Sequence, residues 1–377
     1  MSVVDQIIRL KNAKAAIKQS ISNKGVNVSD EALLDEYPAL IDSIEVGSGS
    51  NEENPYQKLY MQRTANETSM KGLFAYTPSI TLDLSCVNTS KVTDMSNMFD
   101  NCKAPYLDLS GFDVSNVTNM ERMFNYCSSE VNIDGWNISS LNNVSYMFNS
   151  FSGSVDVSKL DFNNATDVTY LFNGAKTDNI ILTGLSFPKT NSLNNMFRSA
   201  EGTLLDLSTW NISNITILSN FVGFSKYKEI NLTNWETTNI TNMENMFYYC
   251  SNLERLIIPD WDMTNVTNTS NFFNKCDKLH TVRLDNCDHD TISKIIALLP
   301  TNTISGATRV IYCKKENADG LVEPQTWRFI FEVPAEYSNE VLTVPEQRIE
   351  EVVVEQENLL LIEEKTTYDS DNENLII

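Results

Sequence analysis

The sequence of 377 residues predicts an α/β solenoid, a stack of about eight to nine rungs preceded by an N-terminal helical hairpin. Two observations predict the stack. A nearly constant "MF" motif returns every 24 to 26 residues, and a short alternation of apolar and polar residues precedes each copy. Periods of about 20 to 50 residues mark repeat arrays, whose units are stable only against their neighbours. We therefore expect each rung to hold one strand and one short helix.

The "MF" motif sets the register of the array. Its second residue is apolar in every copy, and successive copies are separated by 25, 24, 24, 25, 25, 25 and 26 residues. The copies in 176–200 and 211–224 are degenerate, so we expect the stack to be irregular there. The eight positions are Phe99, Phe124, Phe148, Phe172, Phe197, Val222, Phe247 and Phe273.

A strand is predicted where two apolar residues flank a single residue, because residues two apart share one face of a strand. Leu107 and Leu109 form one such pair, and nine pairs occur between Leu82 and Leu284. Each pair is expected to point into the core of the stack.

A short helix is predicted over the "MF" motif itself. Apolar residues fall there at positions i, i+3, i+4 and i+7, which form one helical stripe. Thr118 and Glu121 have the spacing of a capping box, and Thr241 and Glu244 repeat it. In the copy at 118, the stripe consists of Met120, Met123, Phe124 and Cys127.

The segment "LDLSGFDVSNVTNMERMFNYC" (107–127) resembles the BspA-like leucine-rich repeats of bacterial and mycoplasmal surface proteins. The resemblance covers roughly residues 80–290 and rests on the same cadence of strand, turn and "MF" motif. It implies a right-handed, leucine-rich-repeat-like solenoid with one strand per rung.

The chain divides into five parts. They are a helical anchoring or oligomerisation hairpin (1–46), a linker with an N-terminal cap (47–79), the solenoid (80–289), a C-terminal cap of a helix and strands (290–335), and an acidic tail (336–377). Within the C-terminal cap, "DTISKIIALLP" predicts a helix with Asp290 as N-cap and Pro300 as stop. The segments "ATRVIYCKK" and "TWRFIFEV" predict two strands that cover the last rung.

Apolar residues at helical spacing predict two helices in residues 3–44, joined near Gly25. So small a unit lacks a sufficient core, and we expect it to oligomerise or to dock. The segment "LKNAKAAIKQSISNKGVNVSDEALLDEYPALIDSI" also resembles a short module of tail and fibre-type proteins of tailed bacteriophages, which implies anchoring to a virion. A coiled-coil dimerisation hairpin is the alternative. The residues expected to anchor are Ile7, Leu10, Ile17, Ile21, Leu33, Leu34 and Leu40.

The formal net charge of −22 argues against nucleic acid and anionic membrane surfaces as partners. No apolar run is long enough to span a membrane, and the charged N-terminus is unlike a secretory signal. From Phe331 onward, 13 acidic residues stand against Arg348 and Lys365. This tail is expected either to be disordered or to give strands such as "EEVVV" and "NLLLI" to a partner.

The residue between the two apolar residues of each strand faces away from the core and forms the best candidate recognition face. Carboxylates one strand spacing apart repel each other. Such a row either binds cations, binds polyols, or turns inward to form hydrogen bonds with loop amides. Ile181 interrupts the row. Its members are Asp83, Asp108, Asn132, Asp156, Asp206 and Asn231.

Three other columns admit a functional and a structural interpretation. Tryptophans form either a sugar-stacking platform or the edge of the core. Cysteines form either a metal or disulfide ladder or small core residues, and seven cysteines without a CxxC pair favour the core. Asn-x-Ser/Thr sequons follow the repeat, so asparagines bonding their own turn explain them better than glycosylation. The columns are Trp136, Trp210, Trp235 and Trp261; Cys102, Cys127, Cys250 and Cys276; and Asn116, Asn214, Asn239 and Asn265.

No nucleophile elbow, phosphate loop or metal-binding helix motif occurs, so no catalytic, metal or cofactor residue is predicted. We expect a non-enzymatic structural and recognition protein of a tailed phage virion, assembled in the host cytoplasm as a homo-oligomer. Residues 1–46 and the acidic tail would contact other virion proteins, and the solenoid would face a host surface protein or glycan. The alternatives are a bacterial cell-surface adhesin and a glycan-cleaving enzyme on a fibre.

Overall fold

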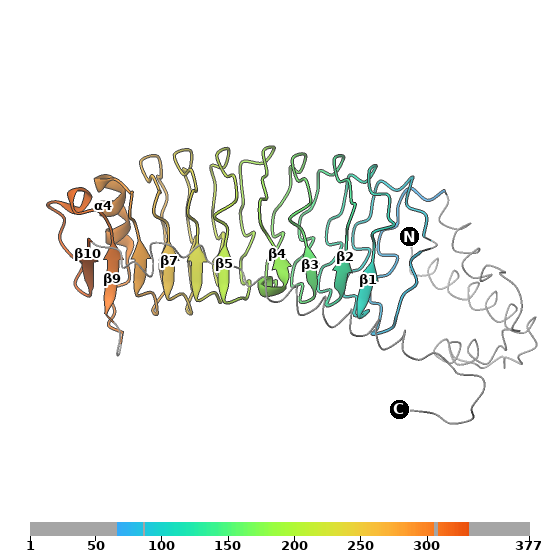
Figure 1. Ribbon diagram of the computed structural model, residues 1–377, viewed down its shortest axis with the longest axis horizontal. Coiled ribbons are helices and arrows are strands. Elements are labelled where there is room, and N and C mark those ends of the chain that lie inside the picture. The colour runs from blue at the N-terminus through green and yellow to red at the C-terminus, as the bar shows by residue number, and fades with distance from the viewer. Residues whose placement is uncertain (1–65, 86, 305–307, 332–377) are drawn as a thin grey trace, which may run out of the picture. The chain divides into compact units, whose positions relative to one another are not determined.

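The computed structural model describes residues 66–85, 87–304 and 308–331, and the predicted N-terminal hairpin and acidic tail lie outside them. The described residues form a β-solenoid with one short strand in each of eight successive rungs (Figure 1). The strands are β1 (Tyr106–Asp108), β2 (Glu130–Asn132), β3 (Ser154–Asp156), β4 (Ile180–Ile181), β5 (Leu204–Asp206), β6 (Glu229–Asn231), β7 (Arg255–Ile257) and β8 (Thr281–Arg283).

The strands pair in parallel and form two sheets. One sheet holds β1 to β4, and the other continues from β5 through β8 to β9 (Arg309–Tyr312) and β10 (Trp327–Ile330). The break between β4 and β5 lies in the region where degenerate copies predict irregularity, and the 3-10 helix η2 (Thr177–Asn179) directly precedes β4. Parallel pairing aligns equivalent residues, for example Leu107 with Val131, so apolar side chains stack into columns.

The strand alternation is confirmed. Leu107, in the middle of β1, and Leu109, just after it, are both fully buried, whereas Asp108 between them is exposed. The pattern works because one face of each strand lies against the interior of the solenoid and the other lies outside.

The predicted short helices are wrong, because the "MF" segments are runs of turns. Arg122 and Tyr126 both have left-handed backbone, with φ of 56° and 53°, and two such residues four apart prevent a continuous helix. Equivalent left-handed residues recur from rung to rung, for example Asn245 and Tyr249. We call each of these segments, such as 120–126 and its equivalents, a turn segment.

Backbone hydrogen bonding explains why turns replace helices. The N–H groups of Met120, Arg122 and Phe124 donate to carbonyl oxygens of the next rung at 2.9, 3.0 and 2.9 Å. The N–H groups between them close local turns, as when Met123 donates to Met120 O at 3.1 Å. Half of the donors are therefore committed between rungs, and a helix would need all of them within the segment.

The predicted capping boxes are also wrong. The Thr118 hydroxyl donates to Thr93 O in the preceding rung at 3.2 Å. The N–H of Glu121 donates instead to Asn119 Oδ1 at 3.1 Å. The Thr118 bond ties the turn segment to the preceding rung, the Asn119 bond is local, and neither caps a helix.

The helical stripe nevertheless identified the core correctly, since the turn segment buries the same four residues. Met120, Met123, Phe124 and Cys127 are each fully buried. The phenylalanine column is continuous from Phe74 to Phe197, with neighbouring ring centroids 5.2 to 5.7 Å apart. Phe74 lies one rung before the first "MF" copy, and Met70 already donates to Asp94 O at 2.9 Å, so the ladder begins before β1.

The helix α4 (His289–Leu298) follows β8 and starts earlier than predicted. Asp288, not Asp290, is the N-cap, and its side chain accepts from Thr291 N at 2.8 Å. Asp290 lies in the first turn, where its charge favours the helix dipole. The predicted strands of the cap are β9 and β10, which extend the parallel sheet, with the 3-10 helix η3 (Glu316–Ala318) between them.

Candidate recognition surface

The predicted Asp/Asn row lies on the outer face of the solenoid, where Asp83 and Asp108 are exposed and Asn231, 9% exposed, is covered by its surroundings. Asp108, Asn132 and Asp156 end strands β1, β2 and β3, and Asp206 and Asn231 end β5 and β6. Asp108 is in register with Asn132, and Asp206 with Asn231, whereas Asp156 is in register with Ile181. Because Val131 is in register with Val155, Asn132 also lies beside Asp156, and the structure brings these residues together as a group of three and a pair, separated by the break between the sheets.

Each member of the row bonds its own loop. Asp108 Oδ1 accepts from the N–H and the hydroxyl of Ser110 at 3.2 and 2.7 Å. Asn231 Oδ1 accepts the same two bonds from Thr233 at 3.1 and 2.7 Å. Asp83, Asn132, Asp156 and Asp206 accept equivalent bonds from the N–H two residues later. Of the three alternatives for this row, bonding of loop amides is the one for which the geometry is present.

Asparagines in the row relieve the repulsion between carboxylates. Asn132 Nδ2 donates to Asp108 Oδ1 at 3.1 Å, and Asn231 Nδ2 donates to Asp206 Oδ1 at 3.2 Å. The Ser110 hydroxyl and N–H, with Asn132, hold the pKa of Asp108 below its ordinary value, because all three donate to the ionised form. The row therefore presents negative charge in a fixed orientation.

The row continues beyond the residues that the sequence predicted. Asn231 is in register with Ile257, Ile257 with Arg283, and Arg283 with Tyr312. The central residues of "LII" and "VRL" occupy the same strand position as Asp108, so the register of the repeat was the signal for them. The outer face thus changes from acidic and amide side chains to apolar, basic and aromatic ones along the stack.

An ion pair at the basic end of this face is largely buried. Arg283 Nη2 lies 2.9 Å from Asp285 Oδ2, and the two side chains are 19% and 17% exposed. Burial raises the pKa of Asp285 above its ordinary value, against the opposing effect of Arg283. Arg255 and Glu229 form a further pair at 3.4 Å in the neighbouring strands.

The tryptophan column belongs to the core and offers no stacking platform. All four predicted tryptophans are at most 7% exposed. The indole N–H groups of Trp136, Trp210 and Trp235 donate to Leu109 O, Leu182 O and Leu207 O at 2.9, 2.6 and 2.9 Å. Trp261 Nε1 is buried without a hydrogen-bond partner among the described residues.

The cysteine column is also part of the core. Cys102, Cys127, Cys250 and Cys276 are free thiols and fully buried. Cys250 Sγ donates to Val222 O at 3.1 Å, and Cys276 Sγ to Phe247 O at 2.9 Å. Within residues 66–85, 87–304 and 308–331, no group of three or more His, Cys, Asp or Glu side chains is placed to hold a metal ion.

The sequon asparagines bond the preceding rung rather than their own turn. Asn116 Nδ2 donates to Ser90 O at 3.0 Å, and Asn239 Nδ2 donates to Ser213 O at 2.7 Å. Asn265 makes the equivalent bond to Thr238 O at 2.8 Å. Structural use of the amide accounts for the recurrence of these asparagines.

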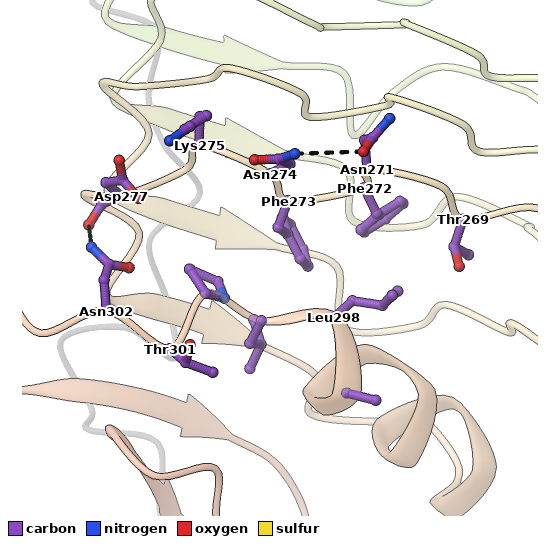
Figure 2. A pocket seen from close by; sticks show the side chains of 13 residues that line it. Thr269, Asn271, Phe272, Phe273, Asn274, Lys275, Asp277, Leu298, Thr301 and Asn302 are labelled. Carbon is purple, nitrogen blue, oxygen red and sulfur yellow. Dashed lines mark hydrogen bonds between the residues drawn. The ribbon is translucent and has the colours of Figure 1, made fainter.

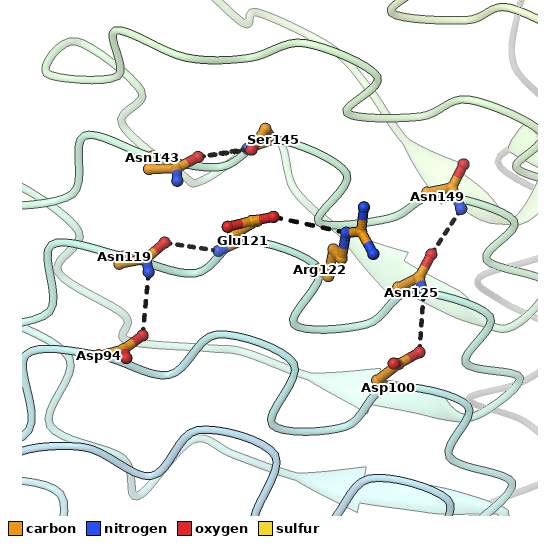
Figure 3. Close-up of polar contacts among 9 residues, drawn as sticks. All are labelled: Asp94, Asp100, Asn119, Glu121, Arg122, Asn125, Asn143, Ser145 and Asn149. Atoms are coloured by element: carbon orange, nitrogen blue, oxygen red, sulfur yellow. Dashed lines mark hydrogen bonds and ion pairs between the residues drawn. The ribbon is translucent and has the colours of Figure 1, made fainter. Parts of the chain in front are cut away.

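Side-chain ladders also run along the turn segments, as Figure 3 shows. Asn149 Nδ2 donates to Asn125 Oδ1 at 2.6 Å, and Asn125 Nδ2 donates to Asp100 Oδ1 at 2.8 Å. Asn119 Nδ2 donates to Asp94 Oδ1 at 3.1 Å in a parallel ladder. Asn125 and Asn149 are each only 7% exposed, so these bonds stabilise a buried polar column.

A pocket of about 470 Å³ lies where the turn segments end, near the C-terminal cap (Figure 2). One wall is the turn segment of the last rung, 269–275, with Asp277. The other wall is 297–302, which comprises the end of α4 and the chain after it. The pocket contains both apolar rings and polar groups, and the sequence did not predict it.

The predicted anchoring residues of 1–46 lie outside the described residues. In the described part of the chain, no helix combines the length and the apolar character that a membrane span requires.

Comparison with known proteins bears on the solenoid. The family described as "Mycoplasma protein of unknown function, DUF285" matches residues 68–185 and 191–299, which together make up more than half of the chain. No curated protein and no solved structure matches the chain. The match to residues 68–299 supports the BspA-like repeat predicted from segment 107–127, and the chain belongs to the DUF285 family.

Proposed function

We propose that this protein is a non-enzymatic structural and recognition component of a tailed phage virion. Residues 1–46 and the acidic tail dock to other virion proteins, and the solenoid is displayed for contact with a host surface protein or glycan. The protein assembles in the host cytoplasm and acts as a homo-oligomer. The resemblance of residues 10–44 to a tail-protein module motivates the particle, and the repeat array motivates the display.

One observation carries the display role: neighbouring rungs fix each other through backbone bonds, ring stacks and polar ladders. Asp108 and Asn132 consequently stand at a fixed strand spacing on the outer face, 3.1 Å apart at their bonded atoms. A rigid, regularly spaced polar array favours recognition, because little conformational entropy is lost when a partner binds. A column of side chains committed to their own loops offers no acid–base pair for catalysis.

The docking role is tested by incorporation into particles. Ile17→Asp in the full chain places a charge on the apolar stripe predicted for the hairpin, and Lys18→Asp is the matched control beside it. Particles are purified on a density gradient and probed for the protein. We expect loss of incorporation for Ile17→Asp alone, and equal incorporation of both variants would contradict the docking role.

The recognition role is tested by removing charge without removing the loop bonds. Asp108→Asn, Asp156→Asn and Asp206→Asn together keep an oxygen acceptor in each loop, as Asn132 and Asn231 already show. Binding of the purified chain to host envelopes is compared with that of the wild type. Unchanged binding by the triple variant would exclude this face as the contact surface.

A bacterial cell-surface adhesin is the second candidate function, and the family description favours it because it names a cellular bacterium. Protease accessibility on intact producing cells distinguishes the candidates. A surface pool in cells that release no particles supports the adhesin. Protein found only in particles supports the virion component.

A further inference from the structure

The stack of turn segments ends with the last rung, whereas the sheet continues beyond it. β8 pairs with β9, and β9 with β10, so the sheet continues for two strands after the last rung. On the side that faces the C-terminal cap, the backbone N–H groups of the last turn segment, 269–275, form no hydrogen bond with any described residue of a further rung. That edge lies against the pocket.

The pairing pattern of the preceding rung identifies which groups are left open. There the N–H groups of Met243, Asn245, Phe247 and Tyr249 donate to carbonyl oxygens of residues 268, 270, 272 and 274 at 2.9, 2.8, 3.1 and 2.8 Å. The equivalent N–H groups of the last turn segment belong to Thr269, Asn271, Phe273 and Lys275, and none has an acceptor among the described residues. We call these four groups the open donor row.

The pocket has room for a single extended segment beside the open donor row. Figure 2 shows Phe273 and Leu298 on opposite walls, with Asn302 bonded to Asp277 at one end. α4 and the chain after it follow β8, so they take up the space in which a complete further rung would stack. The gap of about 470 Å³ between the walls leaves room beside the last turn segment, where α4 and the chain after it already stand in the place of a further rung.

The chemistry of the pocket defines its occupant. Unpaired backbone N–H groups at an open edge bind the carbonyl oxygens of an added strand. Leu298 and Pro300 are partly exposed and offer apolar contacts to alternate side chains, whereas Phe272 and Phe273, only 2% and 3% exposed, line the pocket from beneath. Lys275 and Asp277 are the charged residues in the lining, and the partial positive charge of the donor row adds to that of Lys275.

We propose that the segment "NLLLI" (358–362) of this same chain lies extended in the pocket, with its carbonyl oxygens accepting from the open donor row. It has four successive apolar residues and is flanked by Glu355, Glu357, Glu363 and Glu364, whose charge complements Lys275. The chain enters the tail after Phe331, directly beyond β10 and at the same end of the stack as the pocket.

The length of the tail permits this arrangement. Twenty-six residues separate Phe331 from Asn358. At up to about 3.3 Å per residue they span roughly 90 Å. Strands β8 and β10 are two pairing steps apart, or about 10 Å. This docking uses residues 358–362 of the acidic tail and leaves the rest of the tail for the contact with other virion proteins proposed above, and it holds equally for a cell-surface protein.

Photo-crosslinking of the full chain tests the proposal. The photoreactive residue p-benzoylphenylalanine replaces Lys275 beside the pocket, or Tyr249 at the equivalent place of the preceding rung as the control. We expect irradiation to join position 275, and not position 249, to a peptide that contains 358–362 of the same chain. Absence of that product overturns the proposal, as does a link to any other segment. A mixture of isotopically light and heavy chains identifies links between copies, which would also overturn it.

Hydrogen exchange supplies a second measurement. In the wild type we expect the amides of Asn271, Phe273 and Lys275 to be protected, although the described residues offer them no acceptor. Leu360→Asp should accelerate their exchange by about tenfold or more. The amides of Asn245 and Phe247 show that the solenoid stays folded, and Ser370→Asp is the control for added charge in the tail. Equal exchange in wild type and Leu360→Asp would refute docking of this segment.

Discussion

The phenyl ring of Phe148 lies on that of Phe124, 24 residues earlier, with 5.4 Å between ring centroids and 12° between ring planes. Both side chains are fully buried. Each ring therefore fills the core of its own rung and covers the ring of the rung before it. The stability of one rung depends in this way on side chains supplied by two others.

Removing one ring from this column should be costly. Phe148→Ala leaves a cavity between two rungs and should lower the free energy of unfolding by about 3–5 kcal/mol. Tyr126→Ala, at a side chain that is 58% exposed, is the control and should change it by less than about 0.5 kcal/mol. Urea unfolding followed by circular dichroism provides the comparison. Similar losses for both variants would contradict the packing of the phenylalanine column.

The buried asparagine ladder should be similarly sensitive. Asn149→Ala leaves the Oδ1 of Asn125 without its donor, which costs about 1–3 kcal/mol for a buried polar group. The Nδ2 of Asn173, which donates to Asn149 Oδ1 at 2.5 Å, also loses its acceptor. Asn142→Ala, at an exposed position of the preceding segment, should be nearly neutral in the same unfolding assay. A neutral Asn149→Ala would show that water replaces the ladder.

Two buried tryptophans, of which only one donates a hydrogen bond, form a matched pair that measures what this bond contributes to the free energy of unfolding. Trp235 is 1% exposed and donates to Leu207 O, whereas Trp261 is 2% exposed and its Nε1 has no acceptor among the described residues. Trp235→Phe should therefore cost about 0.5–1.5 kcal/mol more than Trp261→Phe, since only the first removes a hydrogen bond, while Leu207 O keeps the bond from Trp210 N. Equal unfolding free energies for the two variants would disprove the difference in bonding.

Two glycines differ in how closely the preceding rung approaches. A Cβ at Gly153 would lie 1.7 Å from Ser129 O, whereas a Cβ at Gly111 would meet nothing within 4 Å. Gly153→Ala should therefore force the rungs apart and lower stability by more than about 3 kcal/mol. Gly111→Ala should be neutral or slightly stabilising, because alanine restricts the unfolded chain. Thermal unfolding of both variants decides between close and loose stacking at β3.

Stability should fall in acid through the loop aspartates. Hydrogen bonds from Ser110, Ser115 and Thr264 lower the pKa values of Asp108, Asp113 and Asp262 below the ordinary 3.8. A lowered pKa in the folded state adds stability at pH above 3.8, and this contribution disappears as the pH falls through the folded-state pKa. Unfolding midpoints of the wild type should drop across this range.

The variant Asp108→Asn isolates one of these groups. It keeps an acceptor for Ser110 but cannot ionise, so its unfolding midpoint should depend less steeply on pH below 3.8 than that of the wild type. Carboxyl NMR titration of Asp108 in the Ser110→Ala variant should show its pKa rising toward the ordinary value. An unchanged pKa would assign the effect to the Ser110 N–H and Asn132 alone.

The sequence by itself determined the period, the strand positions and the buried columns. Leu107 and Phe124 could be assigned to the core because equivalent residues recur at 24 to 26 positions, and recurrence at constant spacing needs no knowledge of the backbone path. The same register also placed the Asp/Asn row on the outer face.

Only the tertiary structure decided how the backbone of each turn segment is paired. Burial of Met120, Met123, Phe124 and Cys127 fits a helix and a run of turns equally well, so the side-chain pattern could not distinguish them. Asparagines at left-handed positions such as Asn97 and Asn245 were the available signal, because asparagine tolerates that conformation. The backbone conformation of the turn segment is set by N–H groups that donate to residues about 25 positions away, and those acceptors are in place only once the rungs have stacked. For the same reason, the sequence does not reveal the open donor row at Thr269 to Lys275: its residues match those of a paired rung, and only their place at the end of the stack leaves them without an acceptor among the described residues.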